Sequence, residues 1–168
     1  MAYAVDIQSF MQPGGDIVVK ELAIMPLDYE LNPIVLLFKA PFSWSRLNEK
    51  YRRENTRLKR SVHGLEWDSG DIDYTKLGSL LHDSLPDVTT IYVIGNKNKE
   101  FIERFKYFTI DIMELGYPQV DKAKVVQFCP NHDFNCRISC AAQNVKLIKK
   151  FLNAQKEWET ISMEWEYA

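Results

Sequence analysis

Residues 3–25, YAVDIQSFMQPGGDIVVKELAIM, decide the fold class because they predict two strands joined by a tight turn. The segments on either side of the turn, YAVDIQSFM and IVVKELAIM, are rich in the β-branched and aromatic residues that are typical of strands. Pro13, Gly14 and Gly15 lie between them and indicate a turn. The chain is therefore expected to begin with a β-hairpin.

The rest of the chain alternates between helical and strand patterns. Residues 33–41, PIVLLFKAP, form an apolar run bounded by prolines, which predicts a third strand. Leucines at helical spacing predict a helix over 73–85, with Asp73 as its N-cap. The other expected elements are helices over 46–60, 98–108 and 140–155 and strands over 89–95 and 108–115. This order predicts one α/β domain with a mixed sheet in residues 1–154, followed by a C-terminal tail, residues 155–168.

The composition is that of an ordinary globular domain. The 168 residues carry a formal net charge of −2, with 46% hydrophobic and 26% charged residues. This balance gives no global charge that favours nucleic acid or a membrane surface. No apolar run is long enough to span a bilayer, and the N-terminus lacks the basic and apolar regions of a signal peptide. We expect an intracellular protein, cytoplasmic or nuclear, without a membrane partner.

All three cysteines lie in residues 129–140, CPNHDFNCRISC, together with one of the three histidines. Four nitrogen and sulfur ligands around one ion are typical of a closed structural zinc site. Cys136 and Cys140 are one helical turn apart, and the short spacing of Cys129 and His132 lets both reach the same ion. We therefore predict that these four residues bind a structural Zn²⁺ ion. Two alternatives stay open: buried thiols in the core, and a redox pair, although no C-x-x-C motif is present.

Charge is distributed unevenly along the chain. Residues 46–60, RLNEKYRRENTRLKR, contain seven basic residues against two acidic ones and predict an exposed helix. This helix is the best candidate for contacts with nucleic acid phosphates, and the alternative is a solvated helix face. The candidate nucleic-acid-binding residues are Arg46, Lys50, Arg52, Arg53, Arg57 and Arg60. The acidic tail, with Trp158 and Trp165, either folds back on the domain or occupies the basic groove.

The element order and several local strings resemble the ribonuclease-H-like 3′–5′ exonucleases of the DEDDh family. The matching strings are AVDIQSF in the first strand, residues 63–105 beginning HGLEW, FTIDIMEL, and SCAAQNVKLI in the last helix. The resemblance covers about residues 4–152. It implies a ribonuclease-H-like mixed sheet flanked by helices. Active members of the family use four carboxylates to hold two metal ions, with a histidine as general base.

Most positions that the resemblance assigns to catalysis carry other residue types here. Asp6 is present in the first strand. Neutral or basic residues stand at the remaining positions: Gln8 in the first strand, Lys97 or Lys99 after the central strand, and Ser139 and Asn144 in the last helix. A single aspartate does not hold two metal ions, so we expect no catalytic residues at these positions. Our hypothesis is that Lys97 or Lys99 replaces the metal electrostatically and pairs with Asp6.

The chain also resembles two groups of proteins through its cysteine segment. The Maelstrom domain of the small-RNA silencing machinery is a catalytically degenerate version of this fold with a Glu/His/His/Cys zinc set. The chain is similar in that it combines a predicted zinc site with degenerate catalytic positions, although the spacing of its zinc ligands differs. Uncharacterised arthropod proteins associated with mobile elements or viruses share a CPxH…C…CAxxN segment. No function comes with that second resemblance.

Three further features each have two interpretations. His63 either contacts a substrate or metal at the mouth of the degenerate cleft, or packs near Trp67. The acidic loop 68–73 either binds a hard cation or caps the helix that follows. Glu21 either faces inward beside Asp6 and supplies one of the missing carboxylates, or is exposed or paired elsewhere.

Three functions follow from these observations. The first is an inactive exonuclease-like domain with a structural zinc that binds RNA, single-stranded DNA or a partner protein. The second is an unconventional metal-dependent nuclease that uses Asp6, Glu21 or the zinc region. The third is a structural or assembly protein of a virus or mobile element, with the basic helix as its interface. Salt-dependent binding to single strands distinguishes the first from the third.

Overall fold

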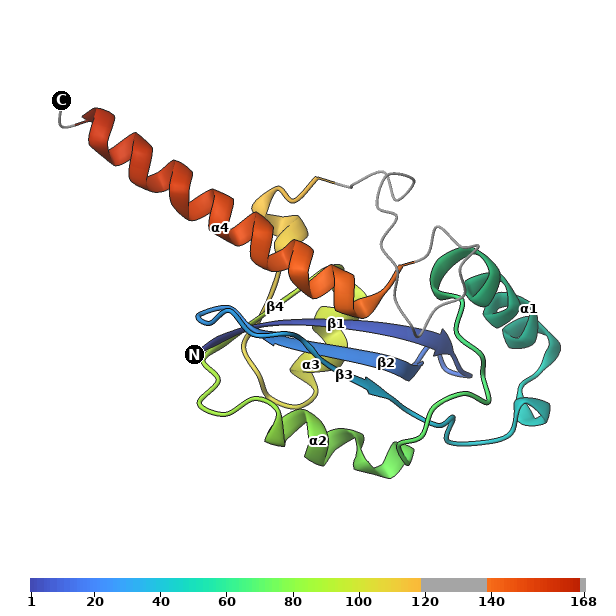
Figure 1. Ribbon diagram of the computed structural model, residues 1–168. Helices are drawn as coiled ribbons and strands as arrows, with labels where there is room; N and C mark the ends of the chain where they lie inside the picture. Colours follow the sequence, from blue (N-terminus) through green and yellow to red (C-terminus); the bar gives the residue numbers. More distant parts are fainter. Residues whose placement is uncertain (119–138, 167–168) are drawn as a thin grey trace.

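The computed structural model describes residues 1–118 and 139–166, with the side chains of residues 1–118 and 139–156. The described strands form one mixed sheet in the order β3-β2-β1-β4-β5 (Figure 1). They are β1 (Ala2–Met11), β2 (Ile17–Pro26), β3 (Ile34–Leu37), β4 (Thr90–Val93) and β5 (Thr109–Asp111). β2 is antiparallel to β1 and β3, whereas β4 is parallel to β1 and β5. The predicted α/β domain with a mixed sheet is confirmed, and the arrangement is compatible with a ribonuclease-H-like fold.

The predicted hairpin of β1 and β2 is confirmed. Gly14 and Gly15 form its turn with φ angles of 90° and 79°, in the left-handed region that favours glycine. Gln8 lies opposite Glu21, and the register shifts between Gln8 and Ser9. This β-bulge begins directly after Gln8, two residues beyond Asp6. Bulges often change the direction of side chains near functional sites.

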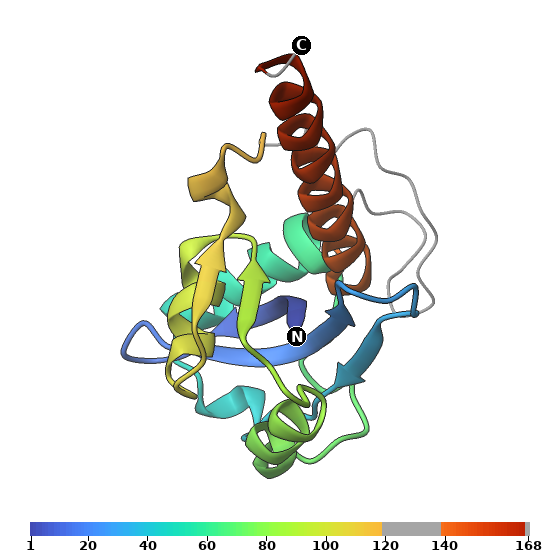
Figure 2. The same ribbon diagram turned by 90° about the vertical axis from the view of Figure 1, so that its left-hand side faces the viewer.

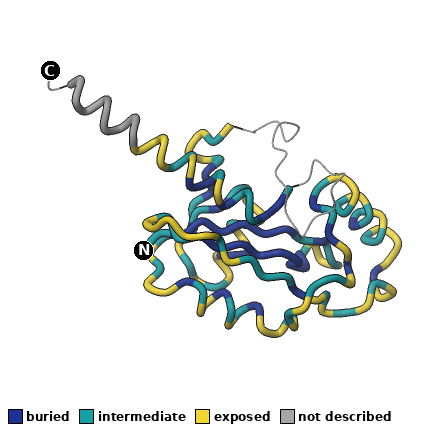
Figure 3. The backbone as a smooth tube through the Cα atoms, viewed as in Figure 1, coloured by how far each residue is buried: buried dark blue, intermediate teal, exposed yellow. Residues whose placement is uncertain are grey.

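Helices cover both faces of the sheet (Figures 1 and 2). Successive strand side chains point to opposite faces, so the hairpin supplies two cores. One core contains Val5 and Leu22 and is covered by α2 (Leu77–Asp83) and α3 (Asn96–Glu103). The other contains Ala4 and is covered by α4 (Ala141–Glu166). The central strands are therefore buried along most of their length, as Figure 3 shows.

A third core anchors α1 (Glu49–Leu58) beside the end of β1, where Phe10, Leu47 and Trp67 are buried. The side chain of Asn55 fixes the helix to the strand. Its Oδ1 accepts a hydrogen bond from the backbone N–H of Met11 at 2.7 Å, and its Nδ2 donates to the Met11 carbonyl at 2.9 Å. The predicted helix over 46–60 is present, but its regular part begins at Glu49 and a single π turn, Lys59–His63, extends it.

The last helix is longer than the sequence predicted. A helix was expected over 140–155, and α4 runs from Ala141 to Glu166, so the boundary expected at residue 154 lies inside it. The first half of α4 lies on the sheet, and the second half extends past the sheet edge (Figures 1 and 2). Within the described residues, no helix combines the length and apolar character that crossing a membrane requires.

The remaining elements also differ in their bounds from the predictions: α3 begins two residues earlier than expected and ends at Glu103, and β3 and β4 are shorter than expected. The strand expected over 108–115 is shorter, because β5 ends at Asp111 and a 3₁₀ turn, Ile112–Leu115, follows. The helix expected over 73–85 begins with a 3₁₀ turn and becomes α2 at Leu77. Asp73 is its N-cap as predicted, since its Oδ1 accepts a hydrogen bond from the Thr75 N–H at 2.9 Å.

Candidate functional site

The candidate site centres on Asp6, which is 2% exposed on the face of β1 that α4 covers. Both carboxylate oxygens of Asp6 accept hydrogen bonds from side-chain amides. Asn98 Nδ2 donates to Oδ1 at 3.0 Å, and Gln8 Nε2 and Asn144 Nδ2 each donate to Oδ2 at 2.9 Å. Three elements, β1, α3 and α4, therefore meet at one buried carboxylate.

Ser139 completes this cluster. Its hydroxyl oxygen is 3.0 Å from Gln8 Nε2 and 3.1 Å from Asn144 Nδ2. Two of the amides that bind Asp6 are thus also held by the serine. Four of the positions that the exonuclease resemblance singled out, distant in sequence, lie together in space: Asp6, Gln8, Ser139 and Asn144.

The hypothesis that Lys97 or Lys99 pairs with Asp6 is wrong. The ammonium of Lys99 forms an ion pair with Glu114 at 2.9 Å, and the ammonium of Lys97 lies 3.7 Å from the sulfur of Met11. The residue between them, Asn98, reaches Asp6 instead. A neutral amide therefore occupies the place where a cation was expected.

The start of α3 explains why Asn98 is selected. Gly95 has a φ of 90° and precedes the helix, and its N–H donates to Asp111 Oδ1 at 2.9 Å. This contact ties the turn between β4 and α3 to the end of β5. Asn98 then lies in the first turn, where its amide also donates to the carbonyl of Ile94 at 3.1 Å. Lys97 and Lys99 flank it and point elsewhere.

Burial dominates the electrostatics of Asp6. Loss of solvation raises its pKa to about 7, and the nearby Glu21 carboxylate acts in the same direction. The hydrogen bonds from Asn144 and Gln8 oppose this rise because they stabilise the charged form. The Asp6 carboxyl therefore titrates near neutral pH, well above an ordinary aspartate.

Glu21 is fully buried on the neighbouring strand, so the inward-facing interpretation is confirmed. Its Oε2 accepts a hydrogen bond from the Ala141 N–H at 3.3 Å, and the Cys140 sulfur lies 4.0 Å from its Oε1. The first residue of α4 is therefore hydrogen-bonded to this second buried carboxylate. The sequence suggested its neighbourhood to Asp6 but gave no signal for its contact with Cys140.

Cys140 is the one predicted zinc ligand that the structure describes. Its thiol is buried and donates to Glu21 Oε1 at 4.0 Å, and cysteine and glutamate are both residue types that bind zinc in proteins. The other predicted ligands, Cys129, His132 and Cys136, lie outside the described residues. Within the described part of the chain, no three His, Cys, Asp or Glu side chains are grouped so that they could hold a metal ion.

His63 is fully buried, which favours the packing interpretation. Its ring meets the edge of Phe10 at a centroid distance of 4.7 Å, and Phe10 in turn contacts Trp67 at 5.4 Å. Its Nδ1 accepts a hydrogen bond from the Leu65 N–H at 3.1 Å. The carbonyl before it, that of Val62, accepts from the Ser139 N–H, so His63 lies close to the point where the chain enters α4.

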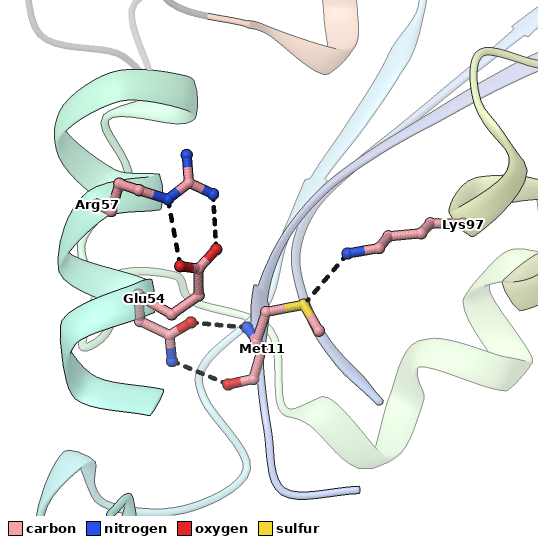
Figure 4. Close-up of polar contacts among 5 residues, drawn as sticks. Met11, Glu54, Arg57 and Lys97 are labelled. Carbon is pink, nitrogen blue, oxygen red and sulfur yellow. Dashed lines mark hydrogen bonds and ion pairs between the residues drawn. The ribbon is translucent and has the colours of Figure 1, made fainter. Parts of the chain in front are cut away.

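A groove of about 800 Å³ lies between α1, the end of β1 and the start of α3. Four cations and two carboxylates line it: Lys50, Arg53, Arg57, Lys97, Glu49 and Glu54. Figure 4 shows two sides of the groove. On α1 the Arg57 guanidinium pairs with Glu54 at 2.6 Å, and from α3 the Lys97 ammonium approaches the sulfur of Met11. Tyr51 adds an aromatic ring. The balance of these side chains is positive.

The structure divides the six predicted nucleic-acid-binding residues into two groups. Lys50, Arg53 and Arg57 line the groove. Arg46, Arg52 and Arg60 are not among its lining residues. Arg46 lies over the Phe42 ring and Arg52 donates to the Ser45 carbonyl at 2.6 Å. Lys97 was predicted to pair with Asp6 and instead belongs to the basic groove, a role that the sequence did not indicate.

No protein-family model matches this chain, and a search of curated proteins finds no significant match.

Proposed function

We propose that this protein is an inactive exonuclease-like domain that binds single-stranded nucleic acid. The observation that carries the proposal is the amide shell around Asp6. In a two-metal nuclease, an aspartate at this position must offer its oxygens to a cation, with other carboxylates beside it. Here Gln8, Asn98 and Asn144 direct N–H groups at both oxygens. The positive ends of three amide dipoles replace the metal charge.

The basic groove supports the binding part of the proposal. Lys97 lines the groove and Asn98 touches Asp6, so consecutive residues of α3 connect the groove to the degenerate site. Lysine and arginine in a groove attract phosphates, and an aromatic ring such as Tyr51 offers a surface on which a base can stack. A strand lying in this groove would pass the place where active relatives cut.

Zinc has a structural role in this proposal. A Zn²⁺ ion held by Cys140 and the predicted ligands Cys129, His132 and Cys136 would fasten the beginning of α4 to the segment before it. Ser139, which directly precedes that end of the helix, and Asn144, in its first turn, both contact the Asp6 cluster. Metal content by mass spectrometry tests this role. We expect one zinc per chain and its loss in Cys140→Ser, and zinc-free protein that folds normally would contradict it.

Binding and cleavage are tested on the same 5′-labelled single-stranded RNA and DNA. We expect salt-dependent binding by fluorescence anisotropy, weakened at least about tenfold in Lys50→Glu/Lys97→Glu and unchanged in the exposed control Lys39→Glu/Lys76→Glu. With Mg²⁺ or Mn²⁺ the oligonucleotides stay intact. Metal-dependent cleavage that Asp6→Asn abolishes would instead support the unconventional nuclease. Absence of binding to any strand would favour the assembly protein.

A further inference from the structure

The loop between β2 and β3 lies beside the first half of α4 and is fastened to it (Figures 1 and 2). The side chain of Lys149 on α4 is 8% exposed and makes both contacts. Its ammonium donates to the carbonyl of Tyr29 at 2.7 Å and forms an ion pair with Glu30 at 2.9 Å. Because these contacts hold the loop against the helix, the space between them is formed before a partner binds, which lowers the entropic cost of binding.

This space is a groove of about 670 Å³, a size typical of ligand sites. Met25 and Leu31 give it an apolar wall. Met25 is buried, whereas Leu31 is 58% exposed and is therefore available to an apolar side chain of a partner. The side-chain amides of Asn32 and Asn153 also line the groove, one from the loop and one from the helix.

Two further lysines of α4, Lys146 and Lys150, line the same groove and are exposed. Unlike Lys149, neither of them has an ion-pair partner among the residues that the structure describes. They are four residues apart in a helix, so they lie on one helix face, about 6 Å apart along the axis. The groove therefore presents two exposed positive charges at the spacing of one helical turn.

This spacing matches that of an extended peptide. Alternate side chains of an extended chain point to the same side and are about 6.6–6.8 Å apart. Two carboxylates separated by one residue can therefore each face one lysine when the peptide lies along α4. The amides of Asn32 and Asn153 each carry a donor and an acceptor, which are the groups that a peptide backbone requires. An apolar residue beside the acidic pair then reaches Leu31.

The lining of this groove differs from that of the groove beside α1. Among the described residues that line it there is no aromatic ring on which a base could stack, and an apolar wall takes the place of one. The two grooves share no lining residue. These differences favour a peptide over a nucleic acid as the occupant, and both grooves can be occupied at the same time.

We propose that the groove between α4 and the β2–β3 loop binds a short extended peptide of a partner protein, in which two acidic residues separated by one residue are flanked by an apolar residue. The carboxylates contact Lys146 and Lys150, and the apolar side chain lies against Leu31. Asn32 and Asn153 form hydrogen bonds with the peptide backbone. This activity is additional to the proposed binding of nucleic acid.

Fluorescence anisotropy of the full chain with a synthetic peptide tests the proposal. The probe is the fluorescein-labelled peptide GGLDSDLGG, and its control, GGLDDSLGG, has the same composition with adjacent aspartates. We expect the probe to bind about fivefold more tightly than the control, because adjacent side chains of an extended chain point to opposite sides and only one can meet a lysine. Affinity for the probe should fall as salt is added.

Three variants of the chain separate the contributions. Lys146→Glu/Lys150→Glu should weaken binding of the probe at least about tenfold. Leu31→Ser leaves the charges unchanged and should weaken it at least about threefold. Lys39→Glu/Lys76→Glu, with exposed lysines elsewhere, should bind the probe like the unmodified chain. All the replaced side chains are exposed, so each variant should keep the melting temperature of the unmodified chain, which distinguishes a lost contact from a lost fold.

Four results would overturn the proposal. The first three are no binding of the probe, equal binding of the two peptides, and unchanged affinity for the probe in Lys146→Glu/Lys150→Glu. The fourth is displacement of the bound probe by a single-stranded oligonucleotide whose own affinity is lost in Lys146→Glu/Lys150→Glu. That result would assign the groove to nucleic acid instead of a peptide.

Discussion

Asn98 Nδ2 lies 3.0 Å from Asp6 Oδ1, so the first turn of α3 places a neutral amide against the buried carboxylate of β1. In a two-metal nuclease this space between strand and helix belongs to a cation and its ligands. Here it is filled by protein hydrogen bonds. The same contact stabilises the fold, and in the proposed inactive exonuclease-like domain it takes the place of a metal ion.

Replacing Asn98 by Asp should destabilise the protein at neutral pH. The change places a second carboxylate about 3 Å from Asp6 and deletes a donor, which costs about 2–4 kcal/mol in free energy of unfolding. The loss should shrink in acid, where the pair shares a proton. Urea denaturation at pH 7 and pH 5 measures both effects. Asn153→Asp, on the exposed face of α4, is the matched control and should change stability by less than about 0.5 kcal/mol.

Asp6 should make stability fall as pH rises towards neutrality. Its pKa is about 7 in the folded chain and near 3.8 when exposed, so between these values the folded state holds a proton that the unfolded state has lost. The stability that this bound proton contributes is fully present below the pKa of the unfolded state, 3.8, and is lost as the pH rises through about 7. Its upper limit is on the order of 4 kcal/mol.

Other carboxylates titrate in the same range, so the comparison must be made with Asp6→Asn. The difference in unfolding free energy between the two proteins should change steadily from pH 4 to pH 7 and then level off. A difference that does not vary with pH would show that Asp6 titrates as an ordinary aspartate.

The sequence was sufficient for the hairpin, because a hairpin depends on local patterns, and the family resemblance was sufficient for most of the neighbourhood of Asp6, whose members are distant in sequence. β-Branched and aromatic residues around a Pro-Gly-Gly turn predict the hairpin, and the resemblance brought Gln8, Ser139 and Asn144 to one place. It was not sufficient for Asn98. Which of three consecutive residues faces β1 depends on where α3 begins, and that is set by the turn at Gly95 and its contact with β5.

Asn55 should prove essential for holding α1 at the end of β1. Asn55→Ala leaves the partly buried N–H and carbonyl of Met11 without their side-chain partner, at a cost of about 2–4 kcal/mol. Because α1 forms one wall of the basic groove, oligonucleotide affinity should fall as well, even though Asn55 carries no charge. Thermal unfolding and anisotropy measure the two effects. Asn32→Ala, at an exposed position, should leave both unchanged.

Replacing Lys20 should lower the free energy of unfolding by more than its sequence context suggests. Its ammonium donates to the carbonyls of Phe38, Trp67 and Ser69 at 2.6, 2.9 and 2.5 Å, and joins three segments in the core. A lysine in a strand gives no signal of this, because its partners come from distant loops. Lys20→Met should cost about 3–5 kcal/mol in urea denaturation. A cost below about 1 kcal/mol would mean that the three carbonyls find water instead.

Direct Mn²⁺ binding to the purified protein at pH 7, followed by electron paramagnetic resonance, tests the central claim of the proposal, that amides stand in place of catalytic metals around Asp6. We predict that the unmodified chain does not bind Mn²⁺, so the spectrum remains that of the free ion. The variant Gln8→Glu/Asn98→Asp/Asn144→Asp, which restores carboxylates around Asp6, should bind the ion. Tight Mn²⁺ binding by the unmodified chain that is lost in Asp6→Asn would contradict the account.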